Sequence, residues 1–237
     1  MKTLEEIMQM FPSTEKEKWS QHSNGNGWVY ITAKVSPLAF IEGVVFGDAR
    51  VSGDARVSGN AQVSGDALVF GDALVSGNAQ VSGNAQVSGN ALVSGDAWVY
   101  GNALVFGDAL VSGNAQVSGN ARVYGIALVS GDALVSGNAR VYGNAQVYGN
   151  AQVSGIAWVS GDALVSGDAW KTSPLYIQGS KHSASNVKYG SIAIGCEVHT
   201  FAEWLEQYKA IGKAAGYNEE QIEEYKAIID LFVKVGR

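Results

Sequence analysis

Hydrophobic and polar positions repeat with a period of six residues over most of the chain. From Gly47 to Trp170 the sequence repeats the word Gly-[Asn/Asp]-Ala-x-Val-[Ser/Phe/Tyr], in which x is most often Leu, Gln or Arg. Ala-x-Val alternates with period two, which is typical of a short strand that turns Ala and Val inward and x outward. Gly followed by Asn or Asp favours positive φ. Each word therefore predicts one short strand and one bend.

Identical words can bury their inward residues by winding around one axis, so that Val stacks on Val in successive coils. This arrangement is a parallel β-solenoid, the usual meaning of a hexapeptide period. A β-meander is the rival fold. The order Gly-Asn and strands of only three residues argue against it, because two-residue hairpins prefer Asn-Gly. We therefore expect a mainly β protein.

The outward residues indicate three words per coil, because they sort into columns when read with a period of 18 residues. One column collects five of the eight outward leucines, and another collects four of the six outward glutamines and ends on Trp170. Aromatic residues that follow Val fall in the third column, with Trp158 nearby. We predict exposed interface rows from the leucines Leu74, Leu92, Leu110, Leu128 and Leu164, and from the aromatics Phe70, Phe106, Tyr124 and Tyr142.

The repeat has one irregularity near its beginning. Val29, Val35 and Ile41 keep the six-residue step, but the next inward residue is Val45, two residues early. This spacing predicts a shortened corner in the first coil.

The repeat divides the chain into three parts: a helical N-terminal cap (1–26), the hexapeptide β-helix (27–170) and a C-terminal segment (171–237). The open ends of a solenoid need covers. In the last part, "LYIQG" and "SIAIGCEV" predict a strand pair. Thr200 and Glu203 then form a capping box that begins one helix, Gly216 ends it, and Asn218 with Gln221 begins a second helix.

Words such as "VSGNAQVSGNA" (81–91) resemble the left-handed parallel β-helix of hexapeptide-repeat proteins of the acyltransferase type, roughly from Val29 to Val165. The resemblance implies the left-handed, three-sided coil and a trimer with three walls facing one another. The flanks "HSNGNGWV" and "IAIGCEVHTFAEWLE" are similar to phage and prophage hexapeptide proteins that carry a transferase label. This second resemblance implies a phage-encoded protein.

Charge and composition limit the classes of partner and the cellular compartment that we expect. The net charge of −6 and the absence of a Lys or Arg cluster argue against a nucleic-acid or anionic-membrane partner. No apolar run reaches the roughly 18 residues of a membrane helix, and the first ten residues do not resemble a signal peptide. A single cysteine, Cys196, fits a reducing compartment. We therefore expect a cytoplasmic protein, in a bacterial host if it is phage-encoded.

Candidate chemistry is sparse. The acyltransferases of this fold use a histidine in a coil or an extended loop as general base. Here His22, His182 and His199 all lie outside the uninterrupted coils. Cys196 and His199 are three residues apart, but two ligands are too few for a zinc site. We expect no metal, no cofactor and no catalytic residue.

The remaining features favour a non-catalytic, oligomeric binding or scaffold protein that contacts a protein partner, for example to block a component of the host. One alternative is an acyl-CoA-dependent acyltransferase. The other is a nucleotide-sequestering protein, in which cations and aromatic rings hold a small anion where the coils end. The candidate ligand residues are Trp170, Lys171, Tyr176, Lys181 and His182. The leucine column could instead be covered by the chain's own tail helices.

Overall fold

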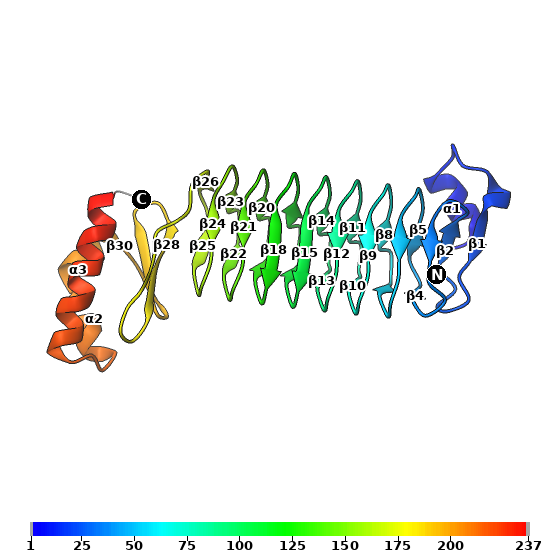
Figure 1. Ribbon diagram of the computed structural model, residues 1–237. Coiled ribbons are helices and arrows are strands. Elements are labelled where there is room, and N and C mark those ends of the chain that lie inside the picture. Colours follow the sequence, from blue (N-terminus) through cyan, green and yellow to red (C-terminus); the bar gives the residue numbers. More distant parts are fainter. Residues whose placement is uncertain (1, 236–237) are drawn as a thin grey trace.

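Stacked coils form the middle of the molecule and give it the shape of a rod with a different cap at each end (Figure 1). The computed structural model describes residues 2–235; the outermost residues of the two predicted terminal segments, 1 and 236–237, lie outside them. Two of the solenoid sheets have eight parallel strands each, so the rod has eight coils. The predicted three-sided parallel β-solenoid is confirmed.

The coils present three walls, each a parallel sheet to which every coil contributes one strand, and wall A has a ninth strand where the coils end. Wall A contains β2 Trp28–Tyr30, β5 Val44–Val45, β8 Gln62–Val63, β11 Gln80–Val81, β14 Trp98–Val99, β17 Gln116–Val117, β20 Leu134–Val135, β23 Gln152–Val153 and β26 Ala169–Trp170. Wall B contains β3 Lys34–Val35, β6 Arg50–Val51, β9 Leu68–Val69, β12 Gln86–Val87, β15 Leu104–Gly107, β18 Arg122–Gly125, β21 Arg140–Val141 and β24 Trp158–Val159. Wall C contains β4 Phe40–Ile41, β7 Arg56–Val57, β10 Leu74–Val75, β13 Leu92–Val93, β16 Leu110–Val111, β19 Leu128–Val129, β22 Gln146–Tyr148 and β25 Leu164–Ser166.

The core is the inner lining of the coils. Every Ala and Val of the words from Ala49 to Val165 is 0% exposed, as the alternation predicts. These inward side chains stack on identical ones in successive coils. The residue x between Ala and Val faces outward on the wall. The burial of this continuous apolar column stabilises the coils.

The corners are held by glycine and by ladders of asparagine. Gly83 has φ +65°, and a Cβ atom placed on it would lie 3.1 Å from the backbone nitrogen and oxygen of Gly101 one coil later. The position therefore requires glycine both for its conformation and for the close approach of the backbones. Beside it, the Asn84 amide donates to Oδ1 of Asn102, and the Asn102 amide donates to Asn120, each at 3.2 Å.

The first coil is shorter than the others, as predicted. Trp28 pairs with Val44 and Lys34 with Arg50, a step of 16 residues, whereas Val44 pairs with Gln62 after 18. Gly43 lies at the shortened corner, where a Cβ atom would come within 2.3 Å of the Ala61 carbonyl oxygen. Only a residue without a side chain lets the chain turn this tightly.

The N-terminal cap is only partly helical. Helix α1 spans Leu4–Met10 and begins with a capping box between Thr3 and Glu6. The prediction that residues 1–26 are helical is wrong after α1. The segment forms a 3-10 turn (η1, Lys16–Lys18) and strand β1 (Trp19–Gln21), which pairs antiparallel with β2. Burial of Trp19 between the rings of Phe11 and Tyr30 explains the extended backbone.

The tail forms a four-stranded antiparallel sheet followed by two helices. Its elements are β27 Tyr176–Gln178, β28 Ser183–Lys188, β29 Ser191–Ile194, β30 Glu197–Thr200, α2 Phe201–Ala214 and α3 Glu219–Val235. Both predicted helices are present. The predicted strand pair is wrong in its partners, because "LYIQG" (β27) pairs with β28, a strand of polar sequence, and "SIAIGCEV" folds into the hairpin β29–β30. Gly195, at φ +59°, makes that hairpin turn.

The tail covers the end of the last coil with hydroxyl side chains. Ser173 Oγ accepts from the Trp158 backbone N–H at 2.9 Å, and Tyr176 Oη and Ser185 Oγ accept from the backbone N–H groups of Asp162 and Leu164, each at 3.3 Å. Backbone donors that a further coil would have satisfied are therefore satisfied by the tail. Among residues 2–235, no helix is long and apolar enough to cross a membrane.

Candidate functional site

The leucine row lies on wall C. Leu74, Leu92, Leu110 and Leu128 pair directly with one another in successive coils, and Gln146 separates them from Leu164. Each leucine is half-buried by its neighbours above and below. Four of the five leucines of the predicted column thus form a continuous apolar strip, and Leu164 lies apart from it.

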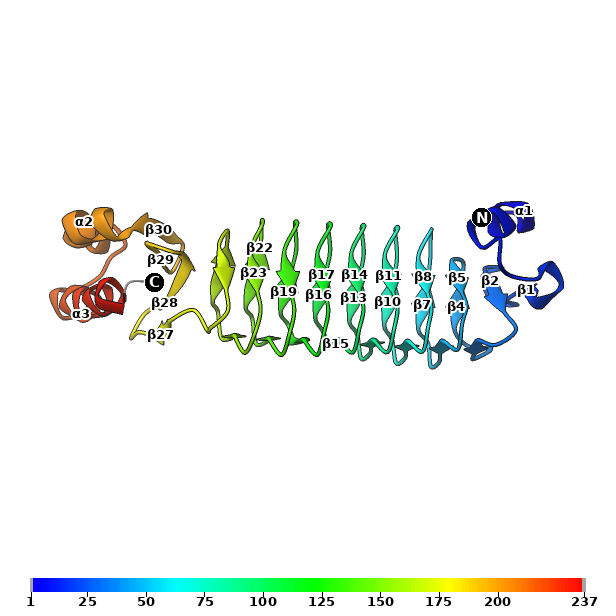
Figure 2. The ribbon, with the colours of Figure 1, turned by 90° about the horizontal axis from the view of Figure 1, so that it is seen from above.

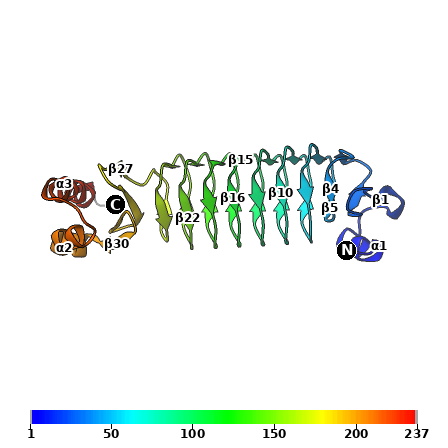
Figure 3. The ribbon, with the colours of Figure 1, turned by 90° about the horizontal axis from the view of Figure 1, so that it is seen from below.

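The tail does not lie along this strip. Three views of the molecule show α2, α3 and the four-stranded sheet beyond the last coil (Figures 1, 2 and 3). Helix α1 sits at the opposite end, where Lys2 Nζ donates to Oδ1 of Asn60 at 2.6 Å. The possibility that the tail helices cover the leucines is therefore wrong: their apolar seam packs on the strands of the tail itself.

The aromatic row follows the strands of wall B. The rings of Phe106, Tyr124 and Tyr142 stack almost parallel, with centroids 4.9 and 5.1 Å apart. Phe70 lies in the same row two coils before Phe106 and is exposed. Beside the row, the Arg140 guanidinium lies 4.9 Å from the centre of the Trp158 ring.

The predicted ligand residues at the end of the coils point in different directions. Trp170 was expected in the outward glutamine column, but Ala169 takes that register opposite Gln152, and Trp170 pairs with the inward Val153. Trp170 is 1% exposed, belongs to the coil core and stacks on Tyr189 at 4.8 Å. The expectation of an exposed Trp170 is wrong. A large ring closes the end of the core, and a register shorter by one residue turns it inward.

Lys181 and His182 face the helical hairpin rather than the coils. Lys181 Nζ donates to the carbonyl oxygens of Ala215 and Gly216, at 2.9 and 3.0 Å, where α2 ends, and it lies 4.6 Å from the centre of the Tyr217 ring. The His182 carbonyl oxygen accepts from Tyr225 Oη at 2.7 Å. Lys171 is exposed just after β26. These contacts give Lys181 a structural role in the tail, as the hydrogen bond from the Asp162 N–H does for Tyr176.

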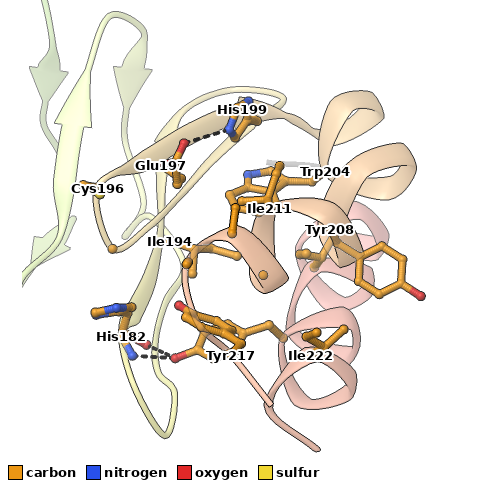
Figure 4. A pocket seen from close by; sticks show the side chains of 16 residues that line it. His182, Ile194, Cys196, Glu197, His199, Trp204, Tyr208, Ile211, Tyr217 and Ile222 are labelled. Carbon is orange, nitrogen blue, oxygen red and sulfur yellow. Dashed lines mark hydrogen bonds and ion pairs between the residues drawn. The ribbon is translucent and has the colours of Figure 1, made fainter. Parts of the chain in front are cut away.

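A cavity of about 720 Å³ opens between the β29–β30 hairpin and the two helices (Figure 4). Its inner surface is apolar and aromatic, and its polar groups lie at its edge. The main lining residues are His182, Ile194, Trp204, Tyr208, Tyr217 and Ile222. Reading the sequence alone missed this cavity. The signal was present in the small residues Gly212, Ala214 and Ala215 near the end of α2, which line the cavity.

Burial acts on the hydroxyl of Tyr217 in the cavity lining. Burial raises the pKa of the Tyr217 hydroxyl well above its usual range, and the neighbouring Tyr225 adds to the shift. His199 Nε2 lies 3.2 Å from Glu197 Oε2, and the His199 ring packs edge-on against Trp204. His199 thus pairs with Glu197, and Cys196 is exposed at the turn. Within residues 2–235, no three His, Cys, Asp or Glu side chains cluster closely enough to hold a metal ion.

Comparison with known families agrees with the coil geometry. A family model described as YdcK Beta solenoid repeat matches residues 49–65, 61–77, 85–101, 97–113, 115–131, 133–149, 139–155 and 145–161. The chain is a β-solenoid repeat protein. All matched segments of this β-solenoid protein lie in the coils, so the cap and the tail are outside the match. A search of the curated proteins finds no match.

Proposed function

We propose that this β-solenoid protein is a non-catalytic, oligomeric binding or scaffold protein that acts through its walls. The observation that carries the proposal is the uncovered leucine row of wall C, because both caps sit at the ends of the rod (Figure 2). Contiguous apolar surface on a rigid wall is typical of an interface. Full burial of a leucine side chain contributes roughly 1.5–3 kcal/mol, so the remaining exposed half of several leucines supports association.

The placement of the histidines favours binding over acyl transfer. His22 lies in the N-terminal cap, where its Nδ1 lies 3.1 Å from the Asn24 carbonyl oxygen. His182 and His199 line the tail cavity. An acyl acceptor held on a wall would therefore lie away from every general base of this type.

The leucine contact is tested by placing charges on it. The double substitution Leu92→Glu with Leu110→Glu should lower the mass of the assembly in sedimentation velocity, because each carboxylate would have to be desolvated in the contact. The matched control is Gln116→Glu with Gln152→Glu, which places the same charges at outward positions of wall A. An unchanged mass in the leucine variant would contradict the proposed contact.

A further inference from the structure

Large exposed apolar side chains gather on wall B. Of the seven such residues between Trp28 and Trp170, only Trp98 lies on another wall. The other six lie on the strands of wall B or at the corners that precede and follow them: Ile31, Leu38, Phe70, Ile126, Ile156 and Trp158. Ile126 and Ile156 are 66% and 70% exposed and stand where the word otherwise has Asn or Asp. Wall B and the two rows of corners that border it therefore carry most of these exposed apolar side chains.

The C-terminal half of wall B is cationic and aromatic. Arg122 and Arg140 pair in register at its outward positions, beside the stacked rings of Tyr124 and Tyr142. The corners that border these two strands carry asparagine and Ile126, and no carboxylate. Neither arginine forms an ion pair within residues 2–235. Within the described residues, the two guanidinium groups thus lack a carboxylate partner, on a surface with the composition of an interface hot spot.

The N-terminal half of the same wall is acidic. Asp48 and Asp66 share one corner row in successive coils, and Asp54 and Asp72 share the other. Elsewhere in the coils, an aspartate receives a hydrogen bond from the asparagine one coil before it, as when Asn90 donates to Asp108 at 2.8 Å. In the described part of the chain, no side-chain hydrogen bond reaches these four carboxylates. Like charges stacked without donors destabilise the isolated wall.

We propose that wall B pairs with wall B of a second copy, with the two rods antiparallel. This proposal concerns a different wall from the leucine row and does not depend on it. A two-fold axis along the strands, between β12 and β15, places β9 opposite β18 and β6 opposite β21. Arg122 then faces Leu68 and its flanking pair Asp66 and Asp72, and Arg140 faces the coil that carries Asp48 and Asp54. The contact is self-complementary, as a two-fold interface requires.

The same axis also brings part of the aromatic row into contact. Phe70 comes opposite Tyr124 in the aromatic row, and Phe106 comes opposite Ser88. At the ends of the contact, Lys34 faces Trp158, so that a cation meets an aromatic ring. Arg50 is the one like-charged partner of Arg140, and Asp48 and Asp54 on either side of it offset that repulsion. Lys2 holds α1 at the corner between walls C and A, away from this surface.

Two variants with opposite charge changes test the pairing. One carries Arg122→Asp and Arg140→Asp; the other carries Asp54→Arg and Asp66→Arg, which removes one member of each stacked carboxylate pair. Both are made in the Leu92→Glu, Leu110→Glu protein, so that only wall B can associate. We expect the parent to be a dimer by sedimentation equilibrium. Each variant alone should associate at least about tenfold more weakly than the parent. An equal mixture of the two should recover the dimer.

The heterodimer is the decisive outcome, because recovery on mixing shows that both variants are folded. Gln116→Asp with Gln152→Asp on wall A is the matched control and should leave the dimer intact. A parent that is monomeric, or a mixture that stays monomeric while circular dichroism shows folded coils, would overturn the antiparallel pairing. The leucine proposal would survive either result, because it is judged by the mass change in the protein with wall B unaltered.

Discussion

At the scale of single residues, backbone conformation separates positions that look identical in the sequence. Gly83 and Gly149 both open a word and both have positive φ, +65° and +62°. A Cβ atom at Gly83 would crowd Gly101, whereas nothing lies within 4 Å of a Cβ atom at Gly149. The difference arises because Gly149 lies near the end of the rod, where no further corner stacks on it.

This difference predicts unequal costs for the same substitution. Gly149→Ala should lower the free energy of unfolding by about 1 kcal/mol, the strain of a left-handed alanine. Gly83→Ala should cost roughly 2–3 kcal/mol, because the backbone of the next coil must also shift. Thermal melts followed by circular dichroism compare the two. Equal melting temperatures would show that the coils adjust freely at the corner.

At the scale of elements, the tail acts as an end cap that replaces a coil. Tail hydroxyls satisfy three backbone N–H groups of the last coil, and Tyr189 covers the Trp170 ring. The tail sheet and helices have an apolar core of their own, so the cap is a folded unit rather than a draped segment.

Removal of residues 171–237 should therefore cause aggregation, because it exposes Trp170 and a row of strand edges. Light scattering during purification of the fragment 1–170 measures this outcome. The full chain with Ser173→Ala, which loses one side-chain hydroxyl but keeps the cover, should stay monodisperse. A fragment that is as monodisperse as that control would refute the capping role.

At the scale of the whole molecule, a rod with two associating walls should show two kinds of contact with different physics. The leucine contact is apolar, whereas the wall B contact depends on charges. Salt screens exposed charges over about 10 Å at 0.1 M and strengthens apolar association slightly or not at all.

Added sodium chloride should then dissociate the wall B dimer in the leucine variant. It should leave unchanged the assembly of a protein that carries Arg122→Asp and Arg140→Asp but keeps Leu92 and Leu110. Sedimentation equilibrium over a series of salt concentrations measures the mass of both proteins. Two proteins that respond equally to salt would mean that the walls are not chemically distinct. A protein with both sets of substitutions should be monomeric throughout.

The hexapeptide pattern alone determined the coils, the three walls, the inward Ala and Val, and the shortened first corner. It could do so because each word repeats the same local choice and the register follows from the period. The leucine and aromatic columns followed for the same reason. The capping box at Thr200 also placed α2 correctly, since its signal is local.

Only the tertiary structure decided what happens where the repeat stops. The inward turn of Trp170, the strand at Trp19, the insertion of β28 between β27 and β29, and the tail cavity all depend on partners distant in sequence. The same holds for wall B, where the corners of different coils come together. Charges 74 residues apart, such as Asp48 and Arg122, share one wall because coils stack at a constant register. Periodicity specifies neighbours along the rod, whereas its ends and its binding surfaces come from contacts that no period encodes.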